Sequence, residues 1–179
     1  MRNDFFNKFL EKSITLRKQF IITAKNEWTP LSVLCELYVQ IGHVYTVLSS
    51  SKYQENNRKI DNLGDELSDV IFQLIILGNM YHFNYEKYKF SSLLDVTLND
   101  LLIVIGQLSE AVMEDCGHRF EKSRAGFDST TKFILFKISQ CFDIIFNVCQ
   151  QHHIDIEAEY QAMINDATNW LRKNYLLDL

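Results

Sequence analysis

Two acidic side chains near the middle of the chain, Glu66 and Asp69, stand three residues apart. In a helix this spacing places both carboxylates on one face. Upstream, Glu36, Gln40 and His43 follow one another at intervals of four and three residues, so they also share a helical face. Carboxylates from two neighbouring helices, directed into one polar pocket, could hold a divalent cation such as Mg²⁺, because this ion prefers oxygen ligands.

These polar side chains lie on two predicted helices, residues 31–48 and 59–81, that are apolar almost all round. A surface helix normally has a broad polar face and a narrower apolar one, and here the proportions are inverted. We therefore expect both helices to be largely buried, with their polar stripes facing a ligand, a partner or trapped water. The alternative is that the stripes form the solvent side of a bundle.

The remaining chain also favours helices. One Pro and six Gly in 179 residues are few for a fold rich in β-turns. Apolar periodicity and stop signals predict further helices at residues 3–24, 91–114 (capped by Ser91-Ser92), 132–151 and 155–174. The sequence thus predicts one all-α domain over residues 1–179, a bundle of about six helices, with an N-terminal helix (1–27), a first half (28–90) and a second half (91–179).

The amino-acid composition limits the kinds of molecule that the protein is expected to bind. An apolar content of 47% argues against disorder, and a net charge of −5 argues against a nucleic-acid binder. The N-terminus lacks the uninterrupted apolar stretch of a signal peptide, and no apolar run approaches the roughly 20 residues that span a bilayer. We expect a soluble, cytoplasmic protein that binds neither nucleic acid nor membrane.

The two halves share a weak repeat. It pairs Ile41-Gly42 with Ile105-Gly106, Leu67-Ser68 with Ile138-Ser139, and the segment from His82 to Glu86 with that from His153 to Glu157. If the repeat is not a chance similarity, two helical hairpins pack about a pseudo-twofold axis. In this register Asp100, Val104, Gln107, Lys137 and Gln140 replace Glu36, Gln40, His43, Glu66 and Asp69. The carboxylate cluster is therefore kept only in the first half.

Residues 28–86 resemble the all-α nucleoside triphosphate pyrophosphatases of the MazG-like superfamily. That family carries Glu-Glu-x-x-Glu on one helix and Glu-x-x-Asp on the next. The second motif is present as Glu66-Leu67-Ser68-Asp69, whereas the first reads Val39-Gln40-Ile41-Gly42-His43. Trp28 and Pro30 stand where some members, such as the dCTP pyrophosphatases, place a Trp and a Pro. Asn169 and Arg172 are similar to part of a C-terminal Lys-x3-Asn-x2-Arg pattern of the family.

The resemblance implies hydrolysis of a nucleoside triphosphate to the monophosphate and pyrophosphate with Mg²⁺ or Mn²⁺. Glu66 and Asp69 would be the catalytic, metal-holding carboxylates, with Glu36 and His43 as further ligands. The residues implied to contact substrate are Gln40, Asp65, Asn169 and Arg172.

The altered first motif changes what the site can hold. Gln40 is neutral, and His43 offers a nitrogen that suits Zn²⁺, Mn²⁺ or Ni²⁺ better than Mg²⁺. The loss of two carboxylates should weaken a bound divalent ion by several kcal/mol, so we expect it to be held weakly without substrate. Two alternatives stay open: an inactive relative that binds nucleotide or a protein partner, and a purely structural helical bundle. The chain could act as a monomer or a homo-oligomer.

Overall fold

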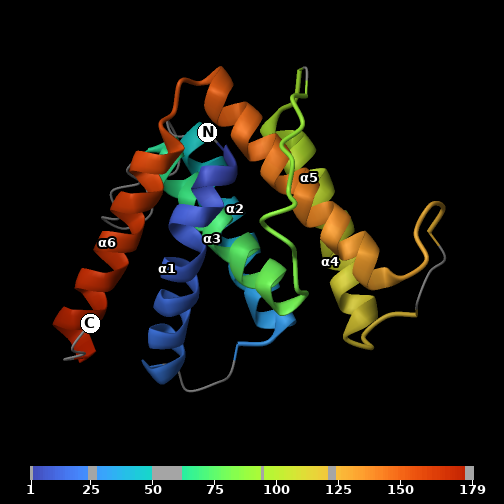
Figure 1. Ribbon diagram of the computed structural model, residues 1–179, viewed down its shortest axis with the longest axis horizontal. Helices are drawn as coiled ribbons and strands as arrows, with labels where there is room; N and C mark the ends of the chain where they lie inside the picture. Colours follow the sequence, from blue (N-terminus) through green and yellow to red (C-terminus); the bar gives the residue numbers. More distant parts are fainter. Residues whose placement is uncertain (1, 24–27, 50–61, 94, 121–123, 176–179) are drawn as a thin grey trace.

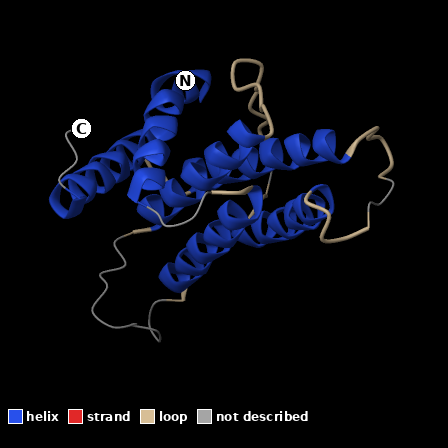
Figure 2. Cartoon of the chain, turned by 90° about the horizontal axis from the view of Figure 1, so that it is seen from below, coloured by secondary structure: helices blue, strands red, loops and turns tan. Residues whose placement is uncertain are grey.

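The computed structural model describes residues 2–23, 28–49, 62–93, 95–120 and 124–175 (Figure 1). Within these ranges the chain forms six α-helices and no β-strand, so the predicted all-α bundle is confirmed (Figure 2). The helices are α1 (Arg2–Thr23), α2 (Pro30–Leu48), α3 (Leu63–Met80), α4 (Leu98–Asp115), α5 (Thr130–Gln151) and α6 (Ile156–Tyr175).

The helices pack as two hairpins with two covering helices. α2 packs on α3 and α4 packs on α5, and the hairpins meet where α3 contacts α5 and α2 contacts α4. This pattern of contacts is the one that an internal twofold axis between hairpins produces. α1 and α6 contact each other and both contact α3, so α3 lies in the middle of the bundle (Figure 1).

Burial follows from these contacts. α3 is enclosed by α1, α2, α5 and α6, and almost every residue from Glu66 to Gly78 is buried, as expected. α2 contacts only α3 and α4 closely, and it leaves Cys35, Tyr38 and Val39 exposed, so the prediction of a largely buried helix is wrong for α2.

The expectation that no segment is long and apolar enough to span a bilayer also needs correction. By length and composition, α2 and α5 are apolar enough to cross a membrane. In α5, 67% of the apolar window is buried inside the fold, as in the core helix of a soluble protein, whereas in α2 the share is 28%.

The fourth helix begins later than predicted. α4 starts at Leu98, and its start is stabilised because the Thr97 amide donates to Asp100 Oδ2 at 2.8 Å. Ser91, predicted to cap this helix, instead belongs to an extended segment that runs along α5 (Figure 1). The Ser91 amide and the Tyr88 hydroxyl both donate to the buried Asp143 Oδ1 of α5, at 2.9 and 2.7 Å.

The two halves repeat one local structure where α3 and α5 end. His82 and His153 both follow the C-cap with φ of 58° and 55°, in the left-handed region. The next amide donates back to the helix at 2.8 Å in each case, from Phe83 to Gly78 and from Ile154 to Cys149. This is the hydrogen bond of a Schellman-type end, normally built on glycine. The end of α4 has the same hydrogen bond, from the His118 amide to the Met113 carbonyl at 2.8 Å, with Gly117 in the left-handed region at φ of 77°, so this geometry does not distinguish the predicted repeat from a common helix end.

Replacing either histidine by glycine should stabilise the protein. A side chain in the left-handed region costs about 1 kcal/mol, and glycine avoids this cost. Both side chains are exposed, so little packing is lost. We expect His82→Gly and His153→Gly each to raise the free energy of unfolding by up to about 1 kcal/mol in urea titrations. His118→Gly, at an exposed position without positive φ, is the matched control and should not stabilise; equal effects at all three positions would contradict the explanation.

Candidate functional site

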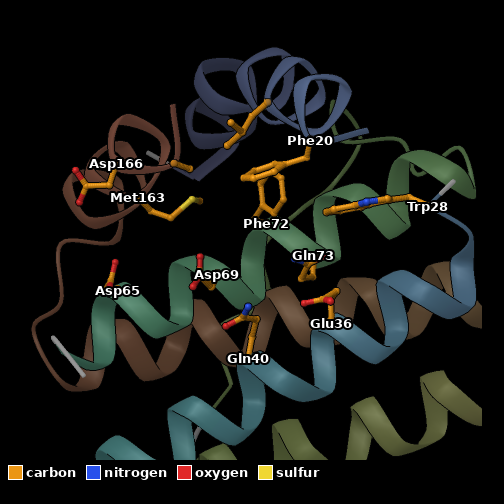
Figure 3. A pocket seen from close by; sticks show the side chains of 12 residues that line it. Phe20, Trp28, Glu36, Gln40, Asp65, Asp69, Phe72, Gln73, Met163 and Asp166 are labelled. Atoms are coloured by element: carbon orange, nitrogen blue, oxygen red, sulfur yellow. The ribbon is translucent and has the colours of Figure 1, made fainter. Parts of the chain in front are cut away.

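A pocket of about 430 Å³ lies between α1, α2, α3 and α6 (Figure 3). This volume falls in the range of small-molecule sites. The carboxylates that line it are Glu36, Asp65, Asp69 and Asp166. The aromatic side chains that line it are Phe20, Trp28 and Phe72. The combination of acidic and aromatic side chains makes it the candidate functional site.

The polar stripes predicted on α2 and α3 face each other across the contact between these helices. Glu36 of α2 and Gln73 of α3 point toward one another, and Gln40 lies opposite Asp69 (Figure 3). All four side chains line the pocket. The stripes therefore form one polar seam along the floor of the pocket. Glu36 in this seam is also exposed to solvent, so the solvent-side alternative describes part of the stripe on α2, whereas Gln73 is buried.

The seam continues beyond the pocket to His43 and Glu66. His43 Nδ1 lies 3.5 Å from Glu66 Oε2 and 3.0 Å from Gln40 Oε1. Glu66 is 8% exposed and is not among the residues that line the pocket. A protonated Nδ1 can donate to Gln40 Oε1, and this hydrogen bond orients the amide that lies opposite Asp69. Glu66 thus lies at the end of a row of polar side chains that reaches the pocket through His43 and Gln40.

The caps of α2 and α3 fix the register of the seam. At the start of α2, the Ser32 amide donates to Thr29 Oγ1 at 3.2 Å and the Thr29 amide donates to Ser32 Oγ at 2.8 Å. At the start of α3, the Asp65 amide donates to Asn62 Oδ1 at 2.8 Å. Asp65 and Glu66 lie in the first turn of α3, where the positive end of the helix dipole stabilises carboxylates.

The pocket has two chemically different ends. At the aromatic end, the rings of Phe20 and Trp28 are nearly parallel, with centroids 6.4 Å apart and an interplanar angle of 18°. At the acidic end lie Asp65, Asp69 and Asp166, the last from α6 (Figure 3). One molecule with a flat ring and a charged group could contact both ends.

The acidic end creates a negative field. Among the described residues that line the pocket, four are carboxylates and none is Lys, Arg or His. The charge of Asp69 also acts on Tyr160 of α6. Burial raises the pKa of this phenol, its hydrogen bond with Ser13 lowers the pKa, and the nearby Asp69 carboxylate raises it. A pocket with this field attracts cations and would repel a bare triphosphate.

The donor set is chemically suited to Mg²⁺ but incomplete. Carboxylate and amide oxygens are the ligands that Mg²⁺ takes in proteins. However, among the described residues no three His, Cys, Asp or Glu side chains converge closely enough to hold an ion. Of the predicted ligands, Glu36 and Asp69 line the pocket, whereas His43 and Glu66 contact each other at the far end of the seam. The pocket could therefore supply only part of a coordination shell.

Of the four residues implied to contact substrate, two line the pocket and two do not. Gln40 and Asp65 line the pocket. Asn169 and Arg172 are exposed on α6 and do not line it; α6 instead turns Met163, Asp166 and Ala167 toward the pocket. Sequence reasoning missed these α6 residues, together with Leu16, Phe20 and Phe72. Helical spacing does connect Met163 with Asp166 and Ala167, but no motif marks them as functional.

At the positions that the predicted repeat aligns with Glu66 and Asp69, the second half carries Lys137 and Gln140. Lys137 Nζ donates to Gln140 Oε1 at 2.7 Å and lies 5.0 and 5.2 Å from the ring centroids of Phe133 and Phe136. Burial lowers the pKa of Lys137. A lysine and an amide thus take the places of Glu66 and Asp69, so this helix pair does not repeat the acidic seam of the first half.

Comparisons of the chain with protein-family models, with curated proteins and with solved structures found no match.

Proposed function

We propose that this protein hydrolyses a nucleoside triphosphate to the monophosphate and pyrophosphate with a divalent cation, as the resemblance to MazG-like pyrophosphatases implies. The observation that carries the proposal is the pocket itself, in which an acidic end and an aromatic end lie in one cavity of about 430 Å³. A nucleotide needs both: a surface for its base, and a cation site for its phosphates.

The acidic end would hold the cation. Asp65, Asp69 and Asp166 supply oxygen donors, and Mg²⁺ or Mn²⁺ bound there would offset the charge of the triphosphate and lower the pKa of a bound water. Because these side chains do not converge on one point, phosphate oxygens and water would complete the coordination. The cation would then bind together with the substrate and only weakly alone.

The remaining side chains would hold and orient the substrate. The rings of Phe20 and Trp28 offer flat faces on which a base can stack. The Asp69 carboxylate, which lines the pocket, would accept a proton from a water that attacks the α-phosphorus, and the pyrophosphate would leave as the bond to its bridging oxygen breaks. Gln40, oriented by His43, faces the same space and could hydrogen-bond a phosphate oxygen.

The incomplete donor set also favours a second candidate. With no convergent group of three ligands among the described residues, the same pocket could bind a nucleotide without cleaving it. This is the inactive relative that the altered first motif suggests.

Product analysis separates the two functions. Each of the common ribonucleoside and deoxyribonucleoside triphosphates is incubated with the protein and Mg²⁺ or Mn²⁺, and monophosphate and pyrophosphate are quantified by ion-exchange chromatography. We expect both products in equal amounts, no diphosphate, and no reaction with EDTA. The double variant Asp65→Asn/Asp69→Asn should be inactive, whereas Glu11→Gln, at an exposed acid outside the pocket, should keep full activity. Monophosphate formation no greater than that of the double variant would exclude the enzyme, and calorimetric binding would then support the second candidate.

A further inference from the structure

The side of the molecule formed by α2 and α4 exposes a group of large apolar side chains. Because α2 contacts α4 and α3 contacts α5, α2 and α4 form one layer, which is the lower side of the molecule in Figure 2. Four of its apolar side chains are 40–60% exposed: Tyr38 and Val39 of α2, and Leu102 and Ile103 of α4. Single exposed apolar residues are ordinary, whereas a group of them on two adjacent helices indicates an interaction site. These four residues, with Gly42 and Gly106, are called the outer face.

The two glycines of the outer face are not required by the fold of a single chain. Gly42 lies three residues after Val39, and Gly106 lies three residues after Ile103, so each shares the exposed face of its helix. Neither has a positive φ, and a Cβ on either would meet no described atom within 4 Å beyond its own helical turn. Alanine would therefore stabilise both helices relative to glycine. Glycine is useful at such a position where another backbone comes close to the helix.

The absence of charge on the outer face favours a second copy of this chain as the partner. Residues 37–49 and 101–109 contain no Asp, Glu, Lys or Arg. Since the chain carries a net charge of −5, two copies that meet through most other surfaces would bring like charges together, and this face avoids that repulsion. Interfaces between identical subunits are the more apolar class, and a twofold dimer uses the same patch on both subunits.

A membrane surface fits the outer face less well than a second copy. α2 is apolar enough to cross a bilayer, and only 28% of its apolar window is buried inside the fold. Helices that lie on a membrane normally carry Lys and Arg beside their apolar face. Neither α2 nor α4 contains a Lys or an Arg, so nothing on these helices would attract an anionic headgroup.

We propose that the outer face joins two copies of this chain in a homodimer, in which α2 and α4 of one copy pack on α2 and α4 of the other. Gly42 and Gly106 allow the helices of the two copies to come close, and the four apolar side chains lose their contact with water. The residues of the outer face do not line the pocket, so each copy keeps its own pocket. The inference therefore does not depend on the proposed function.

Sedimentation velocity of the full chain, over a series of micromolar concentrations, tests the proposal. We expect a species with twice the monomer mass of 21.1 kDa. Ile103→Glu should weaken the dimer at least about a hundredfold, because the new carboxylate would lose its water at the interface without gaining a partner. Ile22→Glu, at an exposed isoleucine of α1 outside the outer face, is the matched control and should change the dissociation constant by no more than about twofold.

The proposal is overturned if the chain stays monomeric at all concentrations, or if Ile103→Glu and Ile22→Glu weaken the dimer equally. A monomer that floats with vesicles of phosphatidylcholine would also overturn it, because the outer face would then bind lipid. If Ile103→Glu does not fold, Gly106→Ala takes its place, since alanine favours the helix. This variant should weaken the dimer at least about tenfold as its Cβ meets the other copy, and an unchanged dimer would contradict the proposal.

Discussion

The variant Asp69→Asn is expected to lose at least about a hundredfold in kcat/KM for triphosphate hydrolysis while it keeps the helical content of the wild type. Asp69 lines the acidic end of the pocket, opposite Gln40. Asparagine has nearly the same shape, so packing is preserved, but it lacks the charge that attracts a divalent cation and the basicity that accepts a proton. Steady-state kinetics in Mg²⁺, with circular dichroism on the same samples, measure both effects.

The matched comparison is Glu66→Gln, in the other acid of the same motif. Glu66 is buried against His43 and does not line the pocket. The change should therefore reduce kcat/KM by no more than about tenfold, through the orientation of Gln40, and should lower the free energy of unfolding by about 1–3 kcal/mol as the buried contact between the Glu66 carboxylate and His43 is lost. Equal losses of activity in the two variants would show that Glu66 reaches the reacting groups, contrary to the separation seen in the structure.

The polar seam was predictable because the residues that form each stripe lie close together in the sequence. Each helix carries one stripe, defined by the spacing of Glu36, Gln40 and His43 on α2 and of Glu66, Asp69 and Gln73 on α3. Helices that follow one another in the chain often pack as a hairpin, and α2 and α3 do so although residues 49–62 separate them. Spacing alone could not separate Glu66 from Asp69. At about 100° per residue they differ by about 60° around the helix, enough for one to face α2 and the other to face the pocket.

The other walls of the pocket depend on contacts between distant parts of the chain. Phe20 comes from α1 and Asp166 from α6, and neither belongs to a motif that local spacing would reveal. The pattern that drew attention to Asn169 and Arg172 selected a different face of α6 from the one that meets the pocket. A helix that is polar on several faces carries no local signal for which face a distant pocket will use.

The late start of α4 has the same kind of cause. Ser91 is a good capping residue in isolation, but its amide hydrogen-bonds to Asp143, 52 residues further along the chain. The capping position goes to Thr97, whose partner Asp100 lies only three residues away. A tertiary hydrogen bond therefore decided between two local signals.

The largest effect on stability is expected from Phe6→Ala. Phe6 is 1% exposed, and its ring centroid lies 4.9 Å from that of Phe142 of α5 and 5.1 Å from that of Tyr85. Removing a ring from such a packed cluster leaves a cavity and typically costs about 3–5 kcal/mol, a large part of the roughly 5–15 kcal/mol that stabilises a domain. Urea unfolding followed by circular dichroism measures the loss.

The control on the same helix is Ile22→Ala, whose side chain is 73% exposed and should change stability by no more than about 0.5 kcal/mol. A loss below 1 kcal/mol for Phe6→Ala would mean that the N-terminal half of α1 does not anchor the helix. That anchoring matters for the site because α1 is one continuous helix. The aromatic cluster fixes its N-terminal turns, and its later turns place Leu16 and Phe20 in the wall of the pocket. Nucleotide affinity of the folded fraction of Phe6→Ala should therefore fall as well, although Phe6 itself does not line the pocket.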